Sequence, residues 1–447
     1  MNRLSTRMLV VFFAVLVLSS FAGALSLVPP KGHGGSVTPA EAISVAQMYL
    51  QWASSNIPNF EDWKNAKLSR PVAYYFPNGT RSAYEFTVLV NGKPDGFILV
   101  AAQRYMPPVL EFGKGEAPSR RLGRIGTARI KGFLRERHKL LYYGALSYSV
   151  ELGNGKAMDI YGRQVPVPKT TKLALSPRQV ASAWRAFDTD TGISDVGVLS
   201  TSTLTKVIPN VPVWTEDSYW TYTRGVGDLG GASTSYPNNV GPKADPWNIW
   251  DGCTPIAAAQ IIAYHEHPEI YENGYYTQEY KEYMTSLVDI LHHTMGTFDT
   301  KDKKGWTWWC GYPGSDACDG IESFASEYQR LKDQGIVSWS LKNNYDAQPT
   351  CTLGLCWEFG GYINEDDVIE EVNSYRPALL QLHNGGSAAD GQGPYGDHSV
   401  VITGYVGNSN TVDYLVIHSG WDMYDHYLTW GNWGSHTHLV KIIPEKR

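Results

Sequence analysis

A cysteine at the start of a predicted helix is the residue in this sequence best suited to nucleophilic chemistry. Cys253 precedes an alanine-rich run, residues 257–263, with Asp251 and Thr254 as candidate capping residues and Pro255 in the first turn. The first turn of a helix has N–H groups without intrahelical partners and the positive end of the macrodipole, so it stabilises a thiolate. The alternative is a small buried cysteine that only begins a core helix.

A histidine at the start of an apolar strand supplies the base that such a thiol needs. His398 opens the apolar run 399–405 and follows Cys253 by about 145 residues, within the ~130–150 that separate cysteine and histidine in papain-type enzymes. Ile256, Ala259 and Ala263 recur at helical spacing, so we expect one face of the cysteine helix to pack on the core.

The two segments resemble streptopain-like, papain-fold cysteine peptidases. Cys253, residues 257–265 and Pro268 are similar to the nucleophile helix, and His398 is similar to the general base, with Asp397 where a small residue often lies. The wider group of double-glycine leader peptidase-like domains is similar as well. The resemblance implies an α+β, papain-like domain that hydrolyses a peptide or protein substrate without a cofactor.

Two further site residues follow only from the resemblance, and the chain departs from the family at both. Family members place a glutamine shortly before the cysteine, but residues 225–252 contain none, so Asn248 is the candidate oxyanion donor, or else a turn residue. The family also orients the base with an asparagine on the next strand, where this chain has His418. Asp422 is the alternative orienting group.

The amino terminus predicts export. Residues 1–25 have the form of a signal peptide, with Arg3 and Arg7, an apolar run over 8–18 and small residues at 22–24. An uncleaved anchor is the alternative, but the apolar run is short for a membrane span, and no later stretch is long enough. We therefore expect a secreted protein without a permanent membrane anchor.

Residues 26–118 predict a small α+β domain. A helix is expected over 38–53, followed by strands over 72–76, 83–90 and 96–102 with Asn-Gly turns between them. The order of these pieces resembles the inhibitory propeptide of streptopain-like enzymes, which implies that this domain binds the chain's own peptidase domain as an inhibitor.

The rest of the chain divides into residues 119–204 and 205–447. The first segment is interpreted as a linker or propeptide extension with a helix over 120–141, a hairpin over 150–160 and a helix over 177–187; an acidic stretch, residues 188–195, resembles a calcium loop only faintly. The second is the papain-like domain. An insertion rich in aromatic residues is expected over 270–345. Later strands are expected over 377–382, 399–405, 414–418 and 438–443.

Five cysteines in an exported chain indicate disulfides. Pairing Cys310 with Cys318 and Cys351 with Cys356 leaves Cys253 as the free thiol. The alternative, a four-cysteine metal site, lacks the CxxC spacing of zinc sites, and the histidine pairs of the chain lack HExxH spacing. We expect no metal.

Charge and composition exclude other classes. With a net charge of −6 and 18% charged residues, the chain has no basic patch for nucleic acid. Together, the resemblance and the predicted signal peptide imply a secreted cysteine endopeptidase made as a zymogen. Two alternatives remain open: a Cys–His amidase or transpeptidase that acts on cell-wall peptides, and a non-catalytic binding protein with the same fold.

Overall fold

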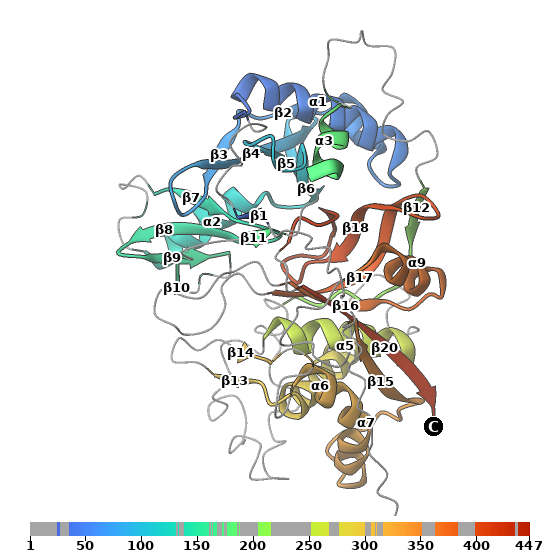
Figure 1. Ribbon diagram of the computed structural model, residues 1–447. Coiled ribbons are helices and arrows are strands. Elements are labelled where there is room, and N and C mark those ends of the chain that lie inside the picture. The colour runs from blue at the N-terminus through green and yellow to red at the C-terminus, as the bar shows by residue number, and fades with distance from the viewer. Residues whose placement is uncertain are drawn as a thin grey trace, which may run out of the picture.

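The protein is a mixed α+β structure built on one large sheet (Figure 1). The computed structural model describes residues 25–26, 35–130, 133, 138–160, 162, 164–167, 172–173, 177–185, 187, 204–215, 252–267, 277–299, 305–308, 310, 316–350, 363–382, 398–433 and 437–447. In Figure 1 the amino-terminal elements lie at the top and left, the strands β16–β18 in the middle, and α5, α6 and α7 at the bottom.

The large sheet runs through both halves of the chain. In spatial order its main path is β10 (Gln164–Pro166), β9 (Lys156–Asp159), β8 (Tyr148–Gly153), β7 (Leu140–Tyr142), β3 (Val72–Tyr75), β4 (Arg81–Val90), β5 (Lys93–Ala101), β6 (Val109–Lys114), β19 (Asp425–Thr429), β18 (Val412–His418), β17 (His398–Gly407), β16 (Ala378–Leu382), β20 (His438–Lys446) and β15 (Asn343–Pro349). Two short strands lie off this path, β2 (Lys67–Leu68) paired with β4 and β12 (Leu204–Val207) paired with β17. The β3–β7 pair is parallel, and the other pairs are antiparallel.

The helix and strands expected in the amino-terminal segment are present as α1 (Pro39–Asn56), β3, β4 and β5. The helix α1 begins at a capping box in which Thr38 and Glu41 exchange backbone and side-chain hydrogen bonds. A short helix, η1 (Glu61–Asn65), follows. The β4–β5 turn has Asn91 and Gly92 at φ of 51° and 78°, the left-handed conformation that an Asn-Gly hairpin requires.

The described parts of residues 119–204 extend that same sheet. The helix α2 (Pro118–Arg129) ends well before residue 141, so the helix expected there is too long, and β7 begins at Leu140. The expected hairpin is β8–β9, and the next helix is α3 (Pro177–Arg185). The acidic stretch 188–195 lies outside the described residues.

In the second unit, the helix α5 (Cys253–Glu266) lies at the centre. Two helices that the sequence did not predict, α6 (Gln278–Thr294) and α7 (Ala317–Asp333), lie in the segment interpreted as an insertion and pack beside α5. The buried Glu266 carboxylate accepts hydrogen bonds from the Asn343 backbone at 3.0 Å and the Tyr345 hydroxyl at 2.6 Å, which fixes the end of α5 to β15. The remaining elements are α9 (Glu365–Asn373), β1 (Leu25–Ser26) paired with β11 (Lys172–Leu173), and β13 (Phe298–Asp299) paired with β14 (Gly305–Trp306).

The two units meet along β6 and β19. Strand β19, which the sequence did not predict, places His426 opposite Gly113 and Leu428 opposite Glu111. The Thr429 hydroxyl also donates to the Val109 carbonyl at 2.6 Å. The amino-terminal unit is therefore joined to the second unit by continuous backbone pairing.

Candidate active site

Cys253 is the first residue of α5, as the sequence predicts. The helix begins after Gly252, whose φ of 92° favours glycine, and no side chain caps it. Thr254 is not a cap, because its hydroxyl hydrogen-bonds the Ser399 hydroxyl at 2.7 Å; Asp251 lies outside the described residues. The expectation of one buried face is also too narrow, since every residue from 254 to 263 is buried. The packing of residues 254–263 fixes the position of the start of the helix.

The Cys253 sulfur lies at the start of α5, beside a backbone hydrogen-bond donor. It is half-buried, takes part in no disulfide, and accepts a hydrogen bond from the Ser399 backbone N–H at 3.2 Å. This N–H and the positive end of the α5 dipole both lie beside the sulfur. The Cys253 N–H lies in the first turn, where helix geometry provides no intrahelical partner, and is a candidate oxyanion donor.

His398 is buried at the start of β17, and its surroundings select one tautomer. Its Nε2 lies 2.6 Å from the Ser419 carbonyl oxygen. Because a carbonyl can only accept a hydrogen bond, Nε2 carries the proton of the neutral ring, and Nδ1 keeps the lone pair. The ring stacks on Trp421, with centroids 6.2 Å apart and planes at 21°. In the neutral ring of His398, the lone pair is therefore on Nδ1.

Two hydrogen bonds connect the cysteine helix to the histidine strand. Ser399, the neighbour of His398, donates its N–H to the Cys253 sulfur and pairs its hydroxyl with Thr254. The first turn of α5 and the first residues of β17 are therefore fixed against each other. The structure places the Cys253 sulfur against Ser399, the residue after His398, although the two segments are far apart in the chain.

The structure does not place His418 or Asp422 on the base. His418 Nδ1 lies 3.2 Å from Gln260 Oε1, and its Nε2 lies 3.3 Å from Asp425 Oδ1. Asp422 Oδ1 lies 2.9 Å from His426 Nε2 instead. Burial acts to lower the pKa of His426, but the Asp422 carboxylate and its acidic neighbours raise it overall. The group that contacts Nε2 of the base is the Ser419 carbonyl, one residue beyond His418.

The groups that sequence reasoning missed are backbone atoms. Neither the Ser399 N–H nor the Ser419 carbonyl has a signature in residue type, since any residue there presents the same atoms. The one residue type that indicates this turn is Gly420, whose φ is 76°. The turn directs the Ser419 carbonyl toward Nε2 of His398. Asn248 and Asp397 lie outside the described residues.

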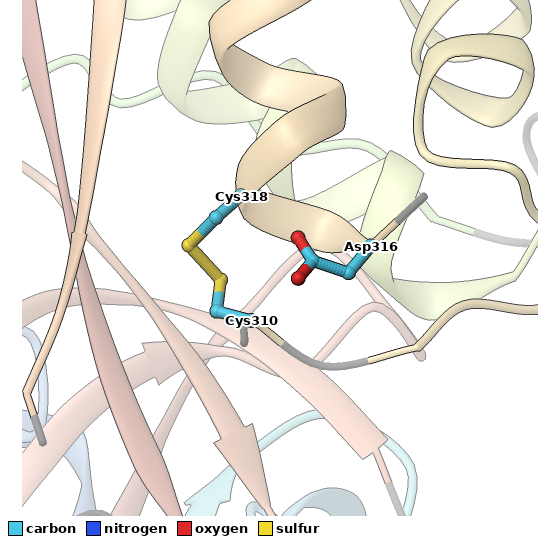
Figure 2. Close-up of side chains that lie close together, drawn as sticks. All are labelled: Cys310, Asp316 and Cys318. Carbon is cyan, nitrogen blue, oxygen red and sulfur yellow. A yellow bond between two sulfur atoms is a disulfide. The ribbon is translucent and has the colours of Figure 1, made fainter. Parts of the chain in front are cut away.

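Among the described residues, one group has metal-ligand proximity, and the disulfide explains it. Cys310 and Cys318 are joined by an S–S bond of 1.99 Å, as predicted, and Asp316 caps α7 by accepting from the Asp319 N–H (Figure 2). Sulfurs in a disulfide are not thiolate ligands. Cys351 and Cys356 lie outside the described residues.

Almost all of the expected signal peptide, residues 1–24, lies outside the described residues. No helix within the described residues is long and apolar enough to cross a bilayer.

No protein-family model matches the chain, and a search of curated proteins finds no match. The functional assignment therefore depends on the residues and geometry of the site.

Proposed function

We propose that the protein is a papain-like cysteine peptidase in which Cys253 is the nucleophile and His398 the general base. The observation that carries this proposal is the placement of the sulfur. It lies at a helix start and accepts a hydrogen bond from the N–H of Ser399. The preceding residue is His398, whose Nε2–H donates to the Ser419 carbonyl. A stabilised sulfur next to an imidazole with its lone pair on Nδ1 has the two groups that acyl transfer needs.

The reaction follows from these two groups. The Cys253 thiol gives its proton to Nδ1 of His398, and the sulfur attacks the carbonyl carbon of the substrate, whose oxygen takes the electron pair as an oxyanion. When the tetrahedral intermediate collapses, the C–N bond breaks and Nδ1–H protonates the leaving amine. Water then attacks the thioester, again with Nδ1 accepting the proton, and the sulfur leaves. The Ser419 carbonyl stabilises the imidazolium throughout, through Nε2–H.

Cleavage of protein substrates tests this proposal. Wild-type protein should digest casein, and Cys253→Ala should not; Cys310→Ala combined with Cys318→Ala, which removes two other sulfurs, should retain the activity per folded molecule. Release of peptides from purified cell wall, with casein left intact, would favour the amidase or transpeptidase alternative. No turnover of either substrate would favour the binding protein.

We also propose that the chain is secreted as a zymogen, with the amino-terminal unit as its propeptide. This unit adjoins the site, because Tyr148 packs edge-on against Trp421 at 5.5 Å, and Trp421 stacks on His398. On incubation, wild-type protein should shorten to a fragment that begins between residues 199 and 209, while Cys253→Ala stays full length. Full activity without shortening would make the amino-terminal unit a permanent part of the enzyme.

A further inference from the structure

One buried arginine connects the amino-terminal unit to the turn that holds the base. Arg121, on α2, is 7% exposed. Its Nη1 donates to the Trp421 carbonyl at 2.9 Å, and its Nε donates to the Ile160 carbonyl at 3.2 Å. A buried guanidinium is stable only where such acceptors are present, so these carbonyls and the arginine fix each other's positions.

Trp421 ends the turn that orients His398. The turn begins at Ser419, whose carbonyl receives the Nε2–H, and passes through Gly420. The Trp421 N–H donates back to the Ser419 hydroxyl at 3.2 Å, which closes the turn. The carbonyl that Arg121 holds and the carbonyl that holds the base belong to residues only two positions apart.

The Trp421 ring is packed among other rings. Its centroid lies 6.2 Å from that of His398, 5.5 Å from that of Tyr148 of the amino-terminal unit and 5.8 Å from that of His426, all within ordinary aromatic packing distance. A shift of the Trp421 backbone would therefore disturb the ring that stacks on the base, as well as the Ser419 carbonyl.

We propose that Arg121 is a positioning residue for His398. By holding the Trp421 carbonyl, it fixes residues 419–421 and with them the tautomer and ring orientation of the base. This inference rests on the proposed Cys253–His398 pair and deepens it. The role belongs to the full-length chain, because the cleavage proposed above, between residues 199 and 209, would separate Arg121 from residues 419–421. Latency of the zymogen would then come from covering Cys253 and not from displacing the base, and after cleavage residues 419–421 would hold the base without this arginine.

Alkylation of Cys253 by iodoacetamide in the full-length chain tests the proposal, since a small reagent does not need the peptide groove. The wild-type rate should show a pH inflection that disappears in His398→Ala. Arg121→Ala should lower the rate about tenfold and shift that inflection, because a misplaced base loses its alignment with the sulfur. Arg121→Lys should recover part of the rate, since an ammonium reaches one carbonyl but lacks the guanidinium fork.

The matched control is Arg124→Ala, which removes the same charge from the same helix at an exposed pair with Glu116. It should leave the rate and the inflection unchanged. Melting temperatures identify variants that fail to fold; if Arg121→Ala is one, Arg121→Gln, which keeps one donor, takes its place. Nitrogen-15 NMR of labelled histidines adds a direct readout: the wild type should show the Nε2–H tautomer at His398, and the Arg121 variant a mixture.

A folded Arg121→Ala or Arg121→Gln protein with the wild-type rate at every pH and the wild-type tautomer would overturn the positioning role. A wild-type thiol that reacts no faster than free cysteine would refute the proposed catalytic pair instead. The two failures are therefore distinguishable.

Discussion

Replacing Glu111 with glutamine should remove a large part of the protein's pH-dependent stability. This carboxyl lies on β6, the strand that joins the two units, and is 2% exposed. It accepts hydrogen bonds from the Tyr142 hydroxyl, the Tyr148 hydroxyl and the Leu146 N–H at 2.7–2.9 Å. Burial raises its pKa from 4.5 to about 7, although these bonds and the charge of His426 act in the opposite direction.

The direction of the effect follows from where the proton binds more tightly. The folded-state pKa exceeds the unfolded value, so the native state binds the proton more tightly than the unfolded chain. This contribution to stability is complete below pH 4.5 and is lost as the pH rises through about 7. Between pH 5 and pH 8 the loss amounts to about 2–3 kcal/mol. Glu111→Gln cannot titrate, and its amide oxygen can keep the bonds to Tyr142 and Leu146.

Urea unfolding at pH 5, 6.5 and 8, followed by tryptophan fluorescence, measures this difference. All proteins carry Cys253→Ala to prevent self-cleavage. The control is Glu116→Gln, which removes a carboxyl from a partly exposed ion pair with Arg124 and should keep the wild-type pH dependence. If Glu111→Gln loses as much stability between pH 5 and pH 8 as the protein with Glu111, the buried carboxyl is not the source, and the reasoning is refuted.

Two further predictions concern the turn beside the base. Gly420→Ala forces a side chain into a φ of 76° and should destabilise the fold by about 1–2 kcal/mol, with a fall in kcat and little change in KM, measured by urea unfolding and peptide hydrolysis. His418→Ala removes the contacts with Gln260 and Asp425 and should lower the melting temperature while reducing kcat less than Gly420→Ala does. A larger kcat loss at an unchanged melting temperature would return the orienting role to His418.

Much of the fold is encoded in local patterns. The capping box at Thr38 and the Asn-Gly turn at residues 91–92 fix the ends of α1 and the β4–β5 hairpin. The alanine-rich run defines α5, and the apolar run after His398 defines β17. These signals involve residues that are close in sequence, so they can be read without the tertiary structure.

The parts that escaped prediction depend on distant contacts. Strand β19, Asp425–Thr429, is short and mixes acidic, imidazole and aromatic side chains, and it becomes a strand because β6 and β18 flank it. The choice between His418 and Asp422 as orienting group could not be settled from sequence, because both side chains have other partners in the fold. The actual contact of the base is a main-chain carbonyl.

The central claim is that Cys253 is a working nucleophile activated by His398. It is tested most directly by treating the native, non-reduced protein with a peptidyl fluoromethyl ketone and mapping the adduct by mass spectrometry. We predict a single adduct at Cys253 that is lost in His398→Ala and retained in His267→Ala, a histidine at the far end of α5. No adduct in the wild type, an adduct at Cys310 or Cys318, or undiminished labelling in His398→Ala would contradict the claim.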